Sequence, residues 1–184
     1  MNQSGLDWID WILILLIITS LGIGFAQGML RQIIGLAALY IAMILAAQYY
    51  VAVSDLIRAV IFQPTNRFLN AIAFFIIAVV VWSLISWMAF DAYRSTKVRL
   101  FPLLDQFGGS ILSLVSAIVA LTLILPVILF MVGEPWPGNE TIRVGIESGM
   151  QASRLVPLFT AIKPAILSSL SPWLPMGLPS IFNL

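Results

Sequence analysis

The sequence contains no cysteine and no histidine, and only 9% of its 184 residues are charged. Without cysteine the chain has neither a disulfide nor a thiolate metal ligand. Without histidine it lacks the commonest metal ligand and the side chain that most readily exchanges protons near neutral pH. These absences leave few ways to build a reactive centre, and we expect no cofactor and no metal.

An excess of charge of one sign is also missing, because nine basic residues nearly balance eight acidic ones and the net charge is +1. Nucleic-acid-binding chains carry a basic face that neutralises phosphates, and no such stripe is present. The sequence also has no glycine-rich phosphate loop and no HExxH pattern. We therefore expect neither nucleic-acid binding nor enzyme activity.

Hydrophobic residues make up 61% of the chain, and its mean hydropathy is +1.05. A soluble domain does not bury this much apolar surface. Four stretches contain no charged residue, namely 11–30, 32–54, 68–90 and 106–133. Each suffices for the roughly 20-residue helix that crosses the hydrocarbon of a bilayer. The expected fold is an all-α membrane protein with about four transmembrane helices and a C-terminal helical tail.

A single charge, Arg31, separates the first two apolar stretches. One continuous helix over 11–54 would be about 66 Å long, whereas the core of a bilayer is about 30 Å thick. The chain must therefore turn back, and Gly24 and Gly28 suit a tight turn. We expect helices at about 8–27, 30–53, 67–90 and 105–132. A kink is expected at Pro126 in the last of them.

Beyond Gly133 the composition changes, since seven of the ten prolines lie there and charge returns. From about 139 to 156, Ile142, Ile146 and Met150 recur at helical spacing opposite charged residues, which predicts an amphipathic helix at an interface. The last 28 residues are too rich in proline to span. We expect them to lie against the membrane or a partner. The predicted domains are a four-helix transmembrane domain at 1–133 and a proline-rich amphipathic interfacial tail at 134–184.

Small residues at four-residue spacing let helices pack closely in lipid, where no hydrophobic force drives them together. The sequence has three such series: Ser20, Gly24 and Gly28; Ala38, Ala42 and Ala46; and Gly109, Ser113 and Ala117. Ser110, Ser113 and Ser116 also recur every three residues. These serines either line a polar path or bond to the backbone of their own or a neighbouring helix.

Two charged residues near helix ends are candidates for function. Arg31 either marks the membrane surface, with its side chain reaching the headgroups, or belongs to a functional site. Asp105 heads the fourth predicted helix, where a carboxylate satisfies free amide groups and the helix dipole. For both residues the structural and the functional alternatives stay open.

Residues 24–35 read GFAQGMLRQIIG, and LDWID precedes them at 6–10. These motifs resemble the colicin V production protein (CvpA) family of bacterial inner-membrane proteins. That family also has an Asp followed by glycines at the start of its fourth helix, which here would be Asp105, Gly108 and Gly109. The resemblance covers about residues 5–133. The chain departs from the pattern at Leu112, Ser113 and Ser116, where the family often has a further glycine and an arginine.

The resemblance implies a multi-pass protein of the bacterial inner (plasma) membrane, connected with envelope maintenance or toxin export. Together with the absence of recognisable catalytic motifs, the resemblance favours a nonenzymatic membrane scaffold or accessory subunit. The alternative is a small channel or transporter component that works as an oligomer. The expected partners are the lipid bilayer and other membrane proteins or further copies of this chain. The candidate functional residues are Gly24, Gly28, Arg31, Asp105, Gly108, Gly109 and Ser113.

Positive charges near the helix ends predict the orientation. Arg31, Arg94, Lys97 and Arg99 lie by the first and third connections, and Arg58, Arg67 and Arg143 lie at the other face. Because basic residues accumulate on the cytoplasmic side, this small bias places both termini outside the cytoplasm. A reporter fused at residue 133 should be active only outside the cytoplasm. Activity confined to the cytoplasm would reverse the orientation.

Overall fold

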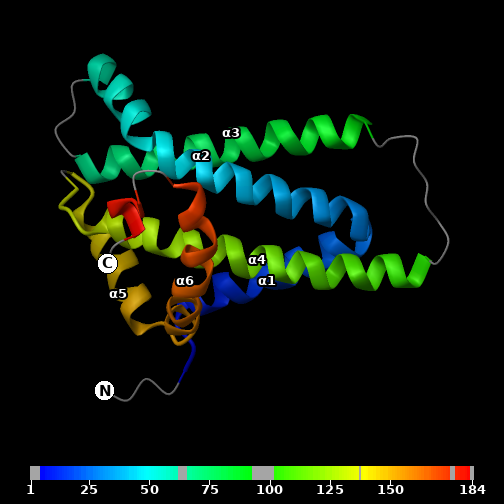
Figure 1. The fold of residues 1–184 in the computed structure, drawn as a ribbon. Helices are drawn as coiled ribbons and strands as arrows, with labels where there is room; N and C mark the ends of the chain where they lie inside the picture. Colours follow the sequence, from blue (N-terminus) through cyan, green and yellow to red (C-terminus); the bar gives the residue numbers. More distant parts are fainter. Residues whose placement is uncertain (1–4, 62–65, 93–101, 137, 175–176, 183–184) are drawn as a thin grey trace.

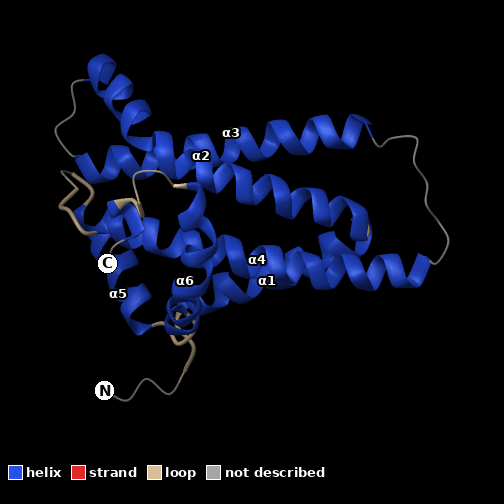
Figure 2. Cartoon of the chain, in the orientation of Figure 1, coloured by secondary structure: helices blue, strands red, loops and turns tan. Residues whose placement is uncertain are grey.

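The computed structural model of the chain describes residues 5–61, 66–92, 102–136, 138–174 and 177–182. Within these ranges all regular structure is helical (Figure 2), which confirms the all-α fold. The α-helices are α1 (Trp8–Gln27), α2 (Met29–Ile61), α3 (Asn66–Ala92), α4 (Pro102–Val132), α5 (Glu140–Ala152) and α6 (Val156–Leu170). Two 3-10 helices, η1 (Ser171–Trp173) and η2 (Ser180–Phe182), follow them.

The first four helices are each long and apolar enough to cross a membrane, as predicted. Three of them are longer than expected, α3 by one residue at its start and two at its end. α2 continues to Ile61 instead of ending near residue 53, and Asp55 and Arg58 form an ion pair of 3.2 Å on this extension, which supports another helical turn. α4 begins at Pro102 because proline suits the first turn of a helix. It continues through Pro126, where the kink stays a prediction.

The four long helices form two pairs (Figure 1). α1 packs along α4, α2 packs along α3, and contacts between α2 and α4 join the pairs. Ala42 and Ala46 of α2 and Ala71 of α3 are fully buried, so small side chains allow α2 and α3 to approach closely. The chain turns back between α1 and α2 as predicted, yet these consecutive helices hardly touch. The two pairs therefore diverge from the turn.

The tail lies across the end of the bundle where α1 begins (Figure 1). α5 confirms the predicted amphipathic helix, although Met150 is buried whereas Ile142 is exposed. α6 meets α5 at an angle of 84° and was not predicted. Prolines obscured its pattern, but Pro157 occupies the first turn, where its missing N–H is tolerated. Pro164 lies inside α6.

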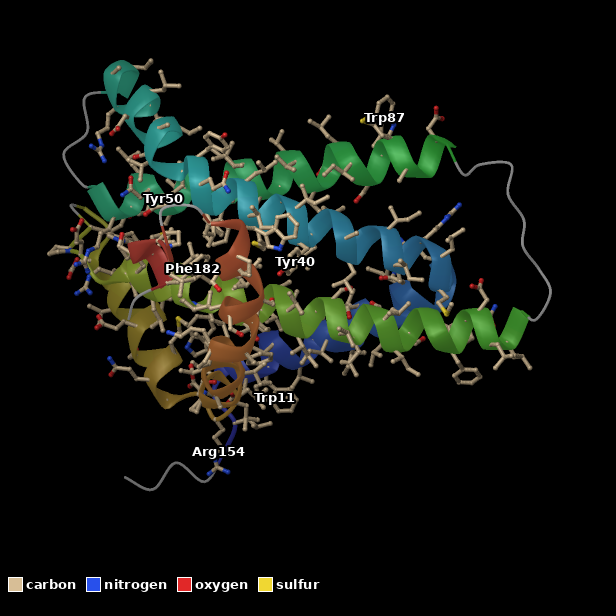
Figure 3. The ribbon with its side chains drawn as sticks, viewed as in Figure 1. Trp11, Tyr40, Tyr50, Trp87, Arg154 and Phe182 are labelled. Carbon is tan, nitrogen blue, oxygen red and sulfur yellow. The ribbon has the colours of Figure 1, made fainter. Side chains whose placement is uncertain are left out.

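The last residues of the chain complete the core of the bundle. Ile181 and Phe182 are at most 1% exposed, and the Phe182 ring meets Phe74 of α3 edge-on, with 5.8 Å between ring centroids. The Gln48 side chain of α2 donates a hydrogen bond to the Trp173 carbonyl at 2.7 Å. Figure 3 shows Phe182 at the end of the bundle. Apolar residues of the tail are thus covered by helices of the same chain.

Side chains from the tail also form hydrogen bonds with backbone carbonyls at the end of α4. Arg143 donates to the Val132 carbonyl at 2.9 Å and pairs with Glu140 and Glu147 at 2.5 and 2.8 Å. The hydrogen bond from Arg143 holds the pKa of Glu140 below its ordinary value. The Trp136 indole donates to the Met131 carbonyl at 3.0 Å. These donors satisfy carbonyls that the end of a helix leaves without partners.

The predicted orientation is not settled by this arrangement. The turn between α1 and α2, the end of α3 and the start of α4 lie at the end of the bundle opposite the tail. Arg94, Lys97 and Arg99, which carry most of the bias, fall outside the described residues. The orientation therefore stays a prediction.

Phe182 tests whether the tail is part of the stable fold. Phe182→Ala should lower the free energy of unfolding by about 3 kcal/mol, the usual cost of truncating a buried phenylalanine. Trp173→Ala is the matched control, because Trp173 is 62% exposed. Thermal unfolding of the purified proteins in detergent measures both changes. Equal stability of the two variants would show that the tail does not pack as described.

Candidate functional site: the α1–α4 seam and the adjoining crevice

α1 and α4 come closest where glycines face each other. A methyl group added to Gly24 would overlap the Gly109 carbonyl, and one added to Gly109 would overlap the backbone of Gly24 and Gly28. Beside them the Ser113 hydroxyl donates to the Ser20 carbonyl, and the Ser20 hydroxyl donates to the Ser113 carbonyl at 3.3 Å. Two of the three predicted series of small residues, one on α1 and one on α4, therefore form one seam.

Asp105 ties this seam to the turn between α1 and α2. Its carboxylate accepts a hydrogen bond of 2.9 Å from the backbone N–H of Met29, the first residue of α2. Asp105 thus caps α2, whereas the sequence suggested that it caps its own helix. The reason is that α4 begins earlier, at Pro102, so Asp105 can reach the neighbouring helix from within the first turn.

The turn itself requires glycine. Gly28 has a φ of 82°, a conformation that side chains other than glycine rarely adopt. A methyl group added there would overlap the Asp105 carboxylate, and one added to Gly108 would come within 2.9 Å of the Met29 sulfur. The structure thus gathers every candidate residue except Arg31 around the seam and its turn.

Arg31 instead lines a crevice between the two helix pairs, near the turn. The crevice has a volume of about 330 Å³ and is bordered by all four long helices. Gln27 and Gln32 lie beside Arg31 and are joined by a hydrogen bond of 3.1 Å between their amides. The crevice follows from the divergence of α1 and α2, which no local sequence pattern predicted.

Serine hydroxyls line the deeper part of the crevice. Ser113 bonds to Ser20 across the seam, and Ser116 donates to the Leu112 carbonyl at 2.9 Å. The predicted bonding of these serines to backbone is thus confirmed for Ser113 and Ser116, whereas a polar path stays a prediction. Ser86 of α3 also lines the crevice, is only 6% exposed, and has no hydrogen-bond partner among the described residues.

A smaller hollow of about 120 Å³ lies where α4 meets α6. Thr122 and Pro126 line it, and the Thr122 hydroxyl is buried without a hydrogen-bond partner in the described part of the chain. At 3.6 residues per turn, Thr122 and Pro126 point away from the face of α4 that carries Ser116 and Ala120. The hollow and the crevice share no lining residue.

Asp10 is the important residue that the sequence analysis missed. It is fully buried, and its carboxylate accepts a hydrogen bond of 2.5 Å from the Ser153 hydroxyl. It also accepts from the backbone N–H groups of Arg154, Leu155 and Asp7 at 3.1, 3.0 and 3.0 Å. The carboxylate thus binds the start of α6, where free amides and the helix dipole favour a negative charge. No local signal could reveal a partner 143 residues away.

Four membrane-spanning helices, a glycine seam and a tail folded onto the bundle define a multi-pass helical membrane protein. Within this class, the family model described as Colicin V production protein matches residues 9–164. The chain belongs to the colicin V production protein family. The match extends beyond the resemblance at 5–133 and includes α5 and part of α6. No curated protein and no solved structure matches the chain.

The turn depends on Gly28 for stability, whereas the crevice residue Arg31 should contribute little to it. Substitutions at the two positions can distinguish these contributions. Gly28→Leu should lower stability by about 1–3 kcal/mol from backbone strain alone, with a further loss from overlap with Asp105. Arg31→Gln should leave stability nearly unchanged, because Arg31 is exposed. Gly22→Leu controls for side-chain size, since nothing lies within 4 Å of its added Cβ. Thermal unfolding in detergent provides the ranking, and a larger loss in Arg31→Gln than in Gly28→Leu would contradict it.

Proposed function

We propose that this protein is a nonenzymatic accessory subunit, or scaffold, of an assembly in the bacterial inner membrane. The observation that carries the proposal is the fixed tail. The Asp10 carboxylate accepts hydrogen bonds from Ser153, Arg154 and Leu155, and these three bonds hold α5 and α6 across the end of the bundle. The family description supports a connection with toxin production, and hence with export across the envelope.

α6 offers an apolar face for such an assembly. Leu158 and Ile162, one turn apart, are 59% and 41% exposed. Trp173, three turns beyond Ile162 and in η1, continues this face and is 62% exposed. The opposite face of α6 packs on the bundle through Phe159 and Leu167. A face held in place by the bundle suits a binding partner better than a mobile end does.

Charge favours a protein over bare lipid as the occupant of this face. Arg143, the basic residue of α5, is engaged by both Glu140 and Glu147. α5 therefore presents no excess of positive charge to anionic headgroups, which attract surfaces rich in lysine and arginine. We propose that another membrane protein covers the exposed face of α6.

The alternative function, a small channel or transporter component, is favoured by the crevice with Arg31 and glutamine side chains among its lining residues. Transport through one copy would need a path across the bundle, yet the crevice and the hollow at Thr122 lie on opposite faces of α4. A transporting form would therefore require several copies or a rearranged α4. Solute flux into liposomes that contain only the purified protein would support this alternative over the scaffold.

Site-specific photo-crosslinking tests the proposed docking face. A photoreactive amino acid at Leu158 or Ile162 should give a protein adduct of one defined mass in native membranes. The matched control is Ile76 of α3, which is 46% exposed on a membrane span and should react with lipid. Asp10→Ala should abolish the adduct at Ile162 while membrane insertion persists, because α6 then loses its anchor.

Two results would contradict the scaffold. One is reaction with lipid alone at Leu158 and Ile162, which would make α6 a purely interfacial helix. The other is an adduct that persists unchanged in Asp10→Ala, because binding would then not depend on the fixed tail.

A further inference from the structure

We propose that the crevice between the two helix pairs binds the headgroup of an anionic phospholipid. The inference does not depend on the proposed scaffold function. It rests on three features of the crevice: an unpartnered buried hydroxyl, a cationic and amide-rich mouth, and walls that continue into the lipid-facing surface.

The hydroxyl of Ser86 points to a missing polar partner. Ser86 is 94% buried, as its exposed fraction of 6% shows, and none of the described residues forms a hydrogen bond with its hydroxyl. A buried polar group without a partner is costly, so native structures nearly always satisfy it. Because Ser86 lines the crevice, a ligand bound there can accept its hydrogen bond.

The mouth of the crevice suits a negative charge. Arg31 lines it and presents a guanidinium, the group that binds phosphate with the most favourable geometry. The amides of Gln27 and Gln32 stand next to it, fixed by their mutual hydrogen bond, and Gln32 is 92% buried, given its exposed fraction of 8%. Arg31 stands at the third position of α2, where its side chain reaches the level of lipid headgroups.

The walls indicate that the ligand comes from the bilayer. Ile23 and Trp82 line the crevice and stay 46% and 44% exposed on helices that are apolar enough to cross a membrane, so these walls can contact lipid. Leu39, another lining residue, stands about 12 Å deeper along α2 than Arg31 at 1.5 Å per residue. Phosphate at Arg31, with an acyl chain that leaves the crevice past Ile23 and Trp82, would match a polar mouth with apolar walls. The volume of about 330 Å³ also falls in the range of ligand pockets.

Native mass spectrometry of the full chain tests the proposal. The delipidated protein is titrated with phosphatidylglycerol and, separately, with phosphatidylcholine of the same acyl chains. The wild type should retain one phosphatidylglycerol with clear preference. Arg31→Gln should weaken this binding about tenfold, the loss expected for one charge-assisted hydrogen bond. Arg154→Gln is the matched control, because it removes one arginine at the opposite end of the bundle (Figure 3).

Two further variants separate binding from folding. Ser86→Ala should weaken phosphatidylglycerol binding several-fold without lowering thermal stability in lipid-free detergent, because the hydroxyl bonds to no described residue. Gly35→Leu should abolish binding by filling the crevice, since an added Cβ at Gly35 meets nothing within 4 Å. Equal retention of the two lipids by the wild type would overturn the proposal. So would equal weakening by Arg31→Gln and Arg154→Gln.

Discussion

The close approach of α1 and α4 at Gly24 and Gly109 is the contact on which the rest of the structure depends. In lipid, helices gain nothing from burying apolar surface, so backbone proximity and hydrogen bonds must hold them together. The absence of side chains at this crossing lets Ser20 and Ser113 exchange hydrogen bonds. It also brings Asp105 to the first amide of α2. One crossing thereby fixes the position of a third helix.

A second consequence of this pairing is the space beside it. Because α1 packs against α4 and α2 packs against α3, the turn at Gly28 joins two helices that diverge. At the opposite end the tail fills the corresponding gap, with Phe182 packed on Phe74. α2, with 33 residues, is about 50 Å long, more than the core of a bilayer. Its far end therefore extends beyond the hydrocarbon, where Leu56 and Val60 are 69% and 79% exposed, and the tail packs nearer the middle of α2, at Gln48.

The parts of this fold that follow from one-dimensional patterns could be predicted. Charge-free runs identified the four spans, and four-residue spacing identified the seam, because both reflect how each segment meets lipid or a neighbouring helix. α6 was missed, since Pro157 and Pro164 mask a helix that depends on packing for its stability. The partners of Asp10 and Asp105 and the crevice with Ser86 were missed for another reason. Each arises from contacts between segments distant in sequence, and no local periodicity records such contacts.

The hydrogen bonds between Asp10 and the start of α6 determine when during synthesis the first helix can take its final place. Translation produces residue 10 well before residues 153–155, so α1 is made while its carboxylate still lacks these donors. A charge that is buried in the finished fold must until then remain near water, because burying it unpaired is very costly. The start of α1 can therefore take its final place only after residues 153–155 have been synthesised. A chain cut short before Ser153 carries, on its first helix, a carboxylate that lacks three of its four hydrogen-bond donors.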